Sequence, residues 1–498
     1  MLTYQDLIAV GESDKARVEF VRDAINKHQS SEIYKTAKIA SEYDHCRNTT
    51  AMAYQKMITD LSGRQYVDYT ATVHRSTSNF FNIFTTQLNQ YLLGNGVKWA
   101  GTASDRLGKN FDTRLQQAGK SALVGGVSFG FFNLDHLEVF SALEFAPLYD
   151  EENGALAAGV RWWQIDKDKP LRATLYEIDG VTNFMWVKGD AAPSGDAWYK
   201  IDSGVWMQPK QPYKLKVAKT EAEGVEILDG ENYPAFPIVP LWGNPNHQSE
   251  LVGLREKIDA YDFIVNGWED DLDNAQLYWI ISGAAGMDDP DLLQFLDRLR
   301  TVKAAAPAEG QSVEPVTVKI PVEARESLLQ RIEKQLYRDA MVMNPEDIAS
   351  GATTATQIRA AYERQNVKAD QFEYCVLDFI NSILAVAGIE DSATFTRSAI
   401  VNVQEEVDTI IKAAPHVGDK YVTQKILMLL GDGDQSEDIV ASLVYNESKV
   451  STTMQMIDAG LMTAEEGRAI IMGEDISTAR AALPKMQDLT TEKQDEIE

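Results

Sequence analysis

The sequence has only two cysteines in 498 residues, Cys46 and Cys375, and they lie far apart. That spacing gives neither a disulfide framework nor the paired ligands of a zinc site, so we expect two reduced thiols. There is no run of eighteen apolar residues, which excludes a spanning helix of the usual kind. The first residues also lack the basic and then apolar segments of a signal peptide. These absences predict a soluble, intracellularly made protein with no membrane partner.

An excess of basic residues is also missing. Lys and Arg number 47 against 75 Asp and Glu, which gives a net charge of −28. A surface of that charge repels nucleic acid, so a basic protein that reads DNA sequence is excluded. The length exceeds the size at which one hydrophobic core keeps growing, and it predicts two to four structural regions.

The first half of the chain contains two different sequence patterns, one after the other. Residues 1–124 carry apolar residues mostly at helical spacing, whereas residues 127–189 are short aromatic and β-branched runs separated by Asp, Asn and Gly. The first pattern predicts helices, and the second predicts an antiparallel sheet with hairpin turns. The fold class expected from the whole chain is α+β, mainly α.

The segment "GVSFG" matches Gly-x-Ser-x-Gly, the turn that presents a nucleophilic serine in many hydrolases, with Ser128 at its centre. That turn needs a strand before the serine and a helix after it, and the order here is reversed. His136, His247 and His416 have no context that marks a catalytic base. We therefore expect Ser128 to be structural. An acidic cytoplasmic serine hydrolase that uses Ser128 stays as the alternative function.

A long apolar seam begins after a Pro-rich loop, near Ser249, which is a plausible helix N-cap. The seam predicts one long helix that opens near Ser249 and continues to Trp279. Between residues 250 and 273 there are eight acidic and two basic residues. Phe263 and Ile264 lie off the seam and need a second partner. The seam residues are Leu251, Leu254, Ile258, Tyr261, Val265, Trp268, Leu272, Ala275 and Trp279.

Further along, proline and glycine punctuate residues 283–321, where we expect residues 301–306 and 313–320 to pair as a small hairpin. A helix follows over 322–341. Pro345 and Gly351 then interrupt helical structure, and a very long helix resumes at about residue 354. Its buried stripe is expected to contain Phe372, Val376, Phe379 and Ile383.

Four quoted segments, in this order, resemble the portal proteins of tailed bacteriophages of the siphophage type. They are "NFFNIFTTQLNQYLLGNGVKW", "GGVSFGFFNLDHLEVFSALEFAPLYDEENGALAAGVRWW", "SELVGLREKIDAYDFIVNGWEDDLDNAQLYWIISG" and "IASGATTATQIRAAYERQ". The second segment contains the Gly-x-Ser-x-Gly match and gives it a structural setting. The N-terminal element of many relatives is represented only loosely, by "IYKTAKIASEY".

The resemblance implies a ring, usually of twelve subunits, at one vertex of the capsid, through which double-stranded DNA is packaged and ejected without sequence readout. It implies no catalytic residue, metal or cofactor. The implied partners are further copies of the chain, the terminase large subunit, scaffolding and major capsid proteins, and a head-completion or adaptor protein. The implied location is the virion, after assembly in the cytoplasm of the host bacterium.

The resemblance also implies a division of the chain. The implied regions are a wing (1–248), a stem helix (249–282), a clip (283–321), a second stem helix (322–341), a tunnel loop (342–354), a wing-crossing helix with its return (355–402), a helical crown (403–484) and a disordered acidic tail (485–498).

The site residues implied by this division fall into three groups. The tunnel-loop group, expected to face DNA, is Asn344, Glu346, Asp347, Ser350, Gly351, Thr353 and Thr354. The acidic stem residues expected to face the channel are Glu256, Asp259, Asp270 and Asp273. The stem residues expected at the subunit interface are Leu254, Ile258, Tyr261, Phe263, Ile264, Val265, Trp268 and Leu272.

Overall fold

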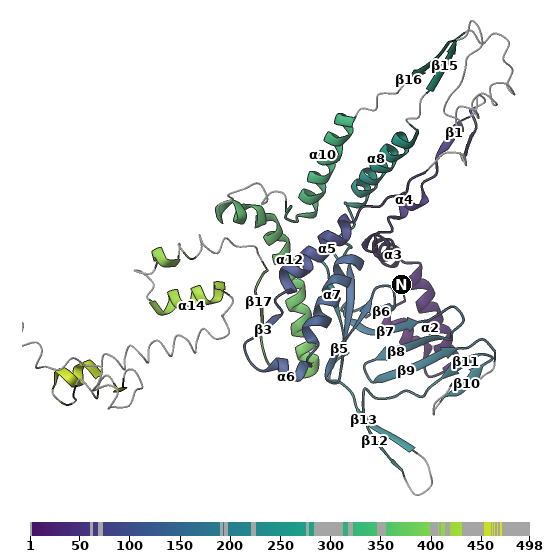
Figure 1. Cartoon of the computed structure of the whole chain (residues 1–498). Coiled ribbons are helices and arrows are strands. Elements are labelled where there is room, and N and C mark those ends of the chain that lie inside the picture. The colour runs from purple at the N-terminus through teal and green to yellow at the C-terminus, as the bar shows by residue number, and fades with distance from the viewer. Residues whose placement is uncertain are drawn as a thin grey trace, which may run out of the picture. The chain divides into compact units, whose positions relative to one another are not determined.

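The computed structural model describes residues 2–59, 63–67, 73–189, 193, 198–220, 226–274, 278–282, 312–316, 322–345 and 355–398, with short stretches between 407 and 470. The chain divides into two compact units, Met1–Ala349 with Ala360–Ala399 and Ser350–Arg359 with Ile400–Glu498. Helices and antiparallel sheets alternate in the first unit, which agrees with the α+β class expected from the sequence (Figure 1).

Four helices and a small hairpin begin the first unit. They are α1 (Tyr4–Val10), α2 (Asp14–Gln29), α3 (Glu32–Asp44), α4 (Thr49–Ala53), β1 (Met57–Thr59) and β2 (Gln65–Val67). Helix α2 buries Val18, Val21, Ala24 and Ile25, which recur at spacings of three and four and so form one apolar stripe. This stripe is the face by which α2 covers a sheet.

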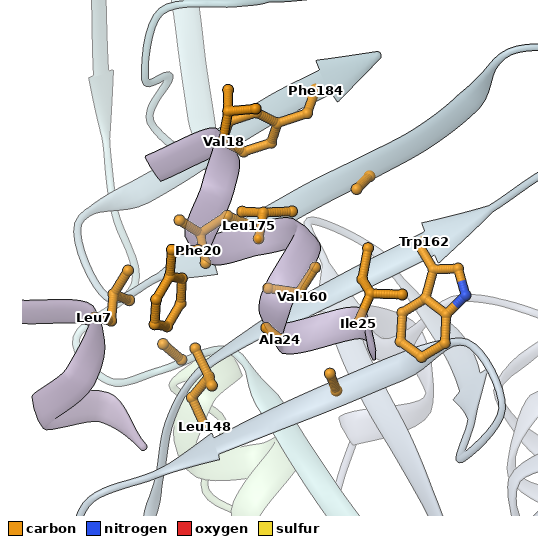
Figure 2. Packing of buried hydrophobic residues seen from close by; sticks show 14 of the residues in the cluster. Leu7, Val18, Phe20, Ala24, Ile25, Leu148, Val160, Trp162, Leu175 and Phe184 are labelled. Atoms are coloured by element: carbon orange, nitrogen blue, oxygen red, sulfur yellow. The ribbon is translucent and has the colours of Figure 1, made fainter. Parts of the chain in front are cut away.

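That sheet has six antiparallel strands in the order β10-β11-β9-β8-β7-β6. The strands are β6 (Phe145–Tyr149), β7 (Leu156–Trp163), β8 (Leu171–Glu177), β9 (Gly180–Trp186), β10 (Tyr199–Asp202) and β11 (Val205–Met207). Figure 2 shows Phe20 and Ile25 of α2 in the same cluster as Leu148, Val160 and Trp162 of the strands, with Ile25 beside Trp162. The antiparallel sheet predicted from the aromatic runs is therefore present, and α1 and α2 cover it.

A second sheet, in the order β14-β4-β5, lies beside α7 and α12. Its strands are β4 (Val127–Asn133), β5 (His136–Ser141) and β14 (Ile238–Trp242), and the helices around it are α5 (Phe80–Leu93), α6 (Ala103–Leu107), α7 (Phe111–Gly125) and α12 (Ala355–Ala387). A Cβ atom on Gly130 would lie 2.4 Å from the ring of Phe379, so glycine is what lets α12 approach β4 this closely. Phe372, Val376, Phe379 and Ile383 are all buried, which confirms the stripe expected on α12.

Two further antiparallel strand pairs belong to the first unit. Strand β3 (Val97–Trp99) pairs with β17 (Ala393–Phe395), which brings the segment after α12 back to the segment after α5. Strand β12 (Lys214–Thr220) pairs with β13 (Glu226–Glu231).

The expectation of one helix over residues 249–282 was wrong at both ends. Helix α8 covers only Arg255–Asn274. Gly253 has a φ of +85°, a left-handed conformation that cannot continue into a helix, so residues 251–254 form turns instead. Ser249 does not cap α8, because the helix begins only at Arg255. The Ser249 hydroxyl accepts from the backbone N–H of Leu251 at 3.1 Å, within the turns before the helix, and donates to the carbonyl of Val124 at 2.6 Å.

Beyond α8 the chain forms a strand, β15 (Tyr278–Ser282), which pairs with β16 (Ser312–Val316). The run "YWIIS" is aromatic and β-branched, and such residues favour a pleated strand over a helix. The partner of β16 is therefore β15 rather than residues 301–306, which lie outside the described residues. The next helix, α10 (Val322–Ala340), agrees with the expected range to one residue.

Little of the second unit is described. Its clearest element is α14 (Asp419–Leu430). Most of the region expected as a crown (403–484), most of the region expected as a clip (283–321) and the C-terminal tail (485–498) lie outside the described residues. In the part of the chain that the structure describes, no helix is both long and apolar enough to cross a membrane.

Candidate functional site

The candidate site is the pair of helices α8 and α10, together with the segment that leaves α10 (Figure 1). At the base of the pair, Ile258 of α8 and Leu336 of α10 are completely buried in one cluster with Phe80 and Phe84 of α5. The Phe80 ring meets the Tyr261 ring edge-on at 5.0 Å between centroids. An ion pair between Lys257 and Asp339 links the two helices at the same level. The pair is thus rooted in the core of the first unit.

The burial at the base of the helix pair shows that two residues predicted at the subunit interface were assigned wrongly. Leu254 and Ile258 are 5% and 0% exposed in the isolated chain, so they belong to its own core and are not available to a neighbouring subunit. The beginning of the apolar seam packs against α3, α5 and α10 of the same chain.

Toward the C-terminal end of α8 the apolar residues become more accessible. Tyr261, Ile264, Val265 and Trp268 are half-buried. Phe263 is 37% exposed and Leu272 is 57% exposed. The expected second partner of Phe263 is supplied in part by Tyr54, whose ring lies edge-on at 5.3 Å. On the facing helix, Val322 and Leu328 are each 45% exposed. The outer half of the helix pair therefore carries apolar surface that the chain does not cover.

The acidic residues of α8 do not form the uniform open face that was expected. Glu256 is exposed. Asp259 instead accepts a hydrogen bond from the Thr50 hydroxyl at 2.9 Å and another from the Tyr43 hydroxyl. Asp270 is 3% exposed and accepts from the backbone N–H of His74 at 2.9 Å. The prediction that Asp259 and Asp270 face a channel is thus wrong in the isolated chain, because both bind groups of the chain itself. The side chain of Asp273 lies outside the described residues.

The segment after α10 is fixed at Met343. The backbone N–H of Met343 donates to Oε1 of Gln365 at 3.0 Å, and the Met343 carbonyl accepts from Nε2 of Gln87 at 3.0 Å. Two glutamine side chains, one from α12 and one from α5, thus replace the neighbouring strand that such a backbone would find in a sheet. We call this arrangement the glutamine clamp.

A lysine fixes the end of α10 beside the clamp. Lys368 of α12 donates to the carbonyl of Ala340 at 2.7 Å and pairs with Oε2 of Glu250 at 2.6 Å. Its ammonium therefore satisfies a terminal carbonyl of α10 and ties α12 to the segment before α8. The roles of Gln87, Gln365 and Lys368 were not predicted from the sequence. The available signal was that Gln365 and Lys368 precede Phe372 on the buried stripe of α12, where polar residues need partners.

The tunnel-loop residues can be followed only as far as Pro345. Asn344 is 6% exposed, so the expectation that it faces DNA is wrong for the isolated chain. Its burial follows from its position directly after the glutamine clamp. Glu346, Asp347, Ser350, Gly351, Thr353 and Thr354 lie outside the described residues.

Ser128 lies in the middle of β4 and is completely buried. Its hydroxyl donates to the carbonyl of Ala118 at 2.8 Å. His136 is exposed beside Asp135, and His247 stacks on Trp242, so neither is placed as a base for this serine. His416 lies outside the described residues. Within the described residues, no group of three or more His, Cys, Asp or Glu side chains could hold a metal ion. The serine hydrolase alternative has no support from this geometry.

We expect Ser128→Ala to fold normally and to lose about 1 kcal/mol of stability, the usual net value of one buried hydrogen bond. A fluorophosphonate probe should label neither the wild type nor the variant. Urea unfolding and probe labelling followed by mass spectrometry measure the two effects. Labelling at Ser128 of the native protein would contradict the structural role.

The chain is similar to known phage proteins over most of its length. The model of the family described as "Phage portal protein, SPP1 Gp6-like" matches residues 23–441. The portal protein of Bacillus phage SPP1 is 22% identical over 425 residues, which cover 79% of this chain and 79% of that protein. The portal protein of Clostridium phage phiCD119 is 25% identical over 201 residues, covering 38% of this chain and 45% of that protein.

Solved structures give weaker likenesses. A chain from the virion of a native gene transfer agent particle is 13% identical, with a TM-score of 0.41, and the alignment covers 71% of this chain and 89% of that chain. A chain from the neck of the native particle is 13% identical, with a TM-score of 0.39, over 70% of this chain and 89% of that one. The assignment rests on the sequence match, which extends over most of the length. The chain belongs to the SPP1 Gp6-like family of phage portal proteins.

Proposed function

We propose that copies of this portal protein close into a ring of twelve around a channel, and that double-stranded DNA enters and leaves a capsid through it without sequence readout. The ring stands at one vertex of the capsid in the virion and assembles in the cytoplasm of the host bacterium. The role is structural and not enzymatic. Membership of the portal family supports the proposal as a whole.

The observation that carries the ring is the uncovered apolar surface on the outer half of the helix pair. In a closed ring each subunit meets its two neighbours with two different surfaces. Phe263 and Leu272 on α8, with Val322 and Leu328 on α10, supply apolar side chains that the isolated chain leaves exposed. Neighbouring copies would bury them, and buried apolar area is the main favourable term in association.

The net charge of −28 supports passage of DNA without retention. Each Lys or Arg that contacts a phosphate displaces counterions and adds affinity, so a basic channel would hold the duplex. An acidic wall repels it. On this proposal Glu256 is the described α8 carboxylate that remains exposed for such a role.

The remaining regions follow the division implied by the resemblance. We propose that residues 283–321 dock the terminase large subunit and later a head-completion or adaptor protein. Residues 1–248 form the wing, which meets the scaffolding and major capsid proteins. The strand pair β15–β16 belongs to the proposed docking end, because it begins four residues after α8 and ends six residues before α10.

Ring formation is tested by negative-stain microscopy and light scattering of the purified protein. Wild type should give rings of about a dozen copies. Leu272→Asp should shift the population toward monomers, because it places a charge on the surface that the neighbour buries. The matched control is Ile165→Asp, at a position 86% exposed on a loop outside the helix pair, and it should leave rings intact. A wild-type protein that stays monomeric at every concentration would contradict the ring.

A further inference from the structure

One segment of the first unit has neither helix nor strand yet is fixed along its length. Residues 73–79, which we call the strap, lead into α5 and lie against α8. The backbone N–H of His74 donates to Asp270 at 2.9 Å, that of Ser76 donates to Asn266 at 2.7 Å, and that of Ser78 donates to Asp262 at 2.9 Å. Every second amide of the strap therefore ends on a side chain of α8.

The spacing of these contacts explains why the two elements fit. Asp262, Asn266 and Asp270 are four residues apart, so they lie on one face of α8, about 6 Å from one to the next. Two residues of extended chain advance by about 6.6 Å. The strap therefore runs antiparallel to α8, and each of the three amides lies opposite one of the three side chains.

The three α8 side chains that hold the strap are buried, and the central one both accepts and donates a hydrogen bond. Asp262, Asn266 and Asp270 are 2%, 1% and 3% exposed. Asn266 also donates through Nδ2 to the Ser76 carbonyl at 3.0 Å, so its amide group binds both backbone groups of Ser76. The imidazole Nδ1 of His74 lies 2.8 Å from the same Asp270 oxygen that accepts from its backbone.

The outer partners of the strap come from the segment between α3 and α4. Asn48 donates to the carbonyl of Ser78 at 3.1 Å and also to Asp262. The hydroxyl of Thr77 donates to the carbonyl of Cys46 at 2.7 Å. The strap is thus bound by α8 on one side and by residues before α4 on the other.

The buried carboxylate of Asp262 depends on hydrogen bonds, and the strap donates one of them. Burial raises the pKa of Asp262, and the hydrogen bonds from Asn48 and Ser78 oppose that rise. In the described part of the chain no Lys or Arg forms an ion pair with it. Its charge is stabilised by N–H groups, and the strap supplies one of them.

We propose that the strap is a conformational lock, which fixes the direction of α8 by occupying the face formed by Asp262, Asn266 and Asp270. These side chains therefore do not face DNA or a neighbouring copy. The lock is a property of a single chain and does not depend on the proposed function, although it determines which face of α8 remains for a ring contact.

The test is hydrogen exchange of the full-length protein, resolved to single amides by electron-transfer fragmentation. The amides of residues 74, 76 and 78 should exchange about tenfold or more slowly relative to those of residues 75 and 77. Asn266→Ala should accelerate the Ser76 amide by about the same factor. Glu269→Gln is the matched control: among the described residues Glu269 accepts from the Ser76 hydroxyl, at 2.9 Å, and not from the Ser76 amide, so that amide should stay slow.

A second variant keeps the test informative where Asn266→Ala fails to fold. Asn266→Asp retains the acceptor for the Ser76 amide but loses the donor to its carbonyl, so protection of that amide should persist. Equal exchange at all five amides, or an unchanged Ser76 rate in a folded Asn266→Ala variant, would overturn the lock. Rings with a uniformly exchanging strap would refute the lock alone. Alternating protection in a protein that never forms rings would refute the proposed ring alone.

Discussion

Lys368→Met is expected to destabilise the first unit by about 3 kcal/mol, as removal of one partner from a buried ion pair does. Lys368 and Glu250 are each 14% exposed at the side chain, so little water can replace the lost ammonium. Glu250 would keep one hydrogen bond, from Asn244 at 2.8 Å. The carbonyl of Ala340 would lose its donor at the end of α10. Methionine preserves the length of the side chain, so the loss reports the charge and its hydrogen bonds rather than a cavity.

Urea unfolding with tryptophan fluorescence measures this change. The control is Lys35→Met, because Lys35 pairs with Glu32 at 2.9 Å on the surface, with side chains 55% and 87% exposed. Such a pair contributes about 0 to 1 kcal/mol. The double variant Glu250→Gln with Lys368→Met should recover part of the loss, because it removes the unpaired charge. Equal losses for Lys368→Met and Lys35→Met would show that Lys368 contributes no more to stability than a surface ion pair does.

The largest functional effect is expected in the loop that follows the glutamine clamp. On the proposed function, Asp347→Lys places a cation from every subunit beside the duplex, and each phosphate contact raises the affinity of the channel for DNA. Gly351→Pro would fix a backbone angle within residues 342–354, which the resemblance implies to be a tunnel loop beside the DNA. We expect both variants to assemble into rings nearly as wild type does, while DNA per capsid falls several-fold. Nuclease-protected DNA per purified capsid, quantified beside ring counts, measures the effect.

Asp347→Asn is the matched control for the first variant. It removes the negative charge without adding a positive one, so packaging should remain near the wild-type level. Normal DNA content in Asp347→Lys, or failure already at ring assembly, would mean that the loop does not face the channel.

Local sequence patterns predicted the elements better than they predicted which partner each element meets. The buried stripe on α12 was read correctly from Phe372 and Phe379, because helical spacing alone reveals a face. The same spacing could not predict that Ile258 packs inside its own chain. An apolar stripe has the same sequence pattern whether it contacts α5 or a second copy of the chain. Gly253 has a left-handed backbone that delays the start of the helix, and the spacing of the apolar residues gives no sign of it.

The polar contacts were the least predictable part. Asp262, Asn266 and Asp270 form a visible four-residue repeat, yet an acidic face normally indicates exposure to solvent. Their partners lie nearly 200 residues earlier in the chain, in a segment with no periodic pattern of its own. The glutamine clamp escaped notice for the same reason, because Gln87 and Gln365 meet only through the tertiary fold.

The glutamine clamp has a mechanical consequence for the segment beyond it. A pull transmitted through Met343 meets the clamp before it reaches α10. Because Gln87 belongs to α5 and Gln365 to α12, the tension divides between two helices that are packed into the core. The clamp therefore shields α10 from force that arrives through this backbone.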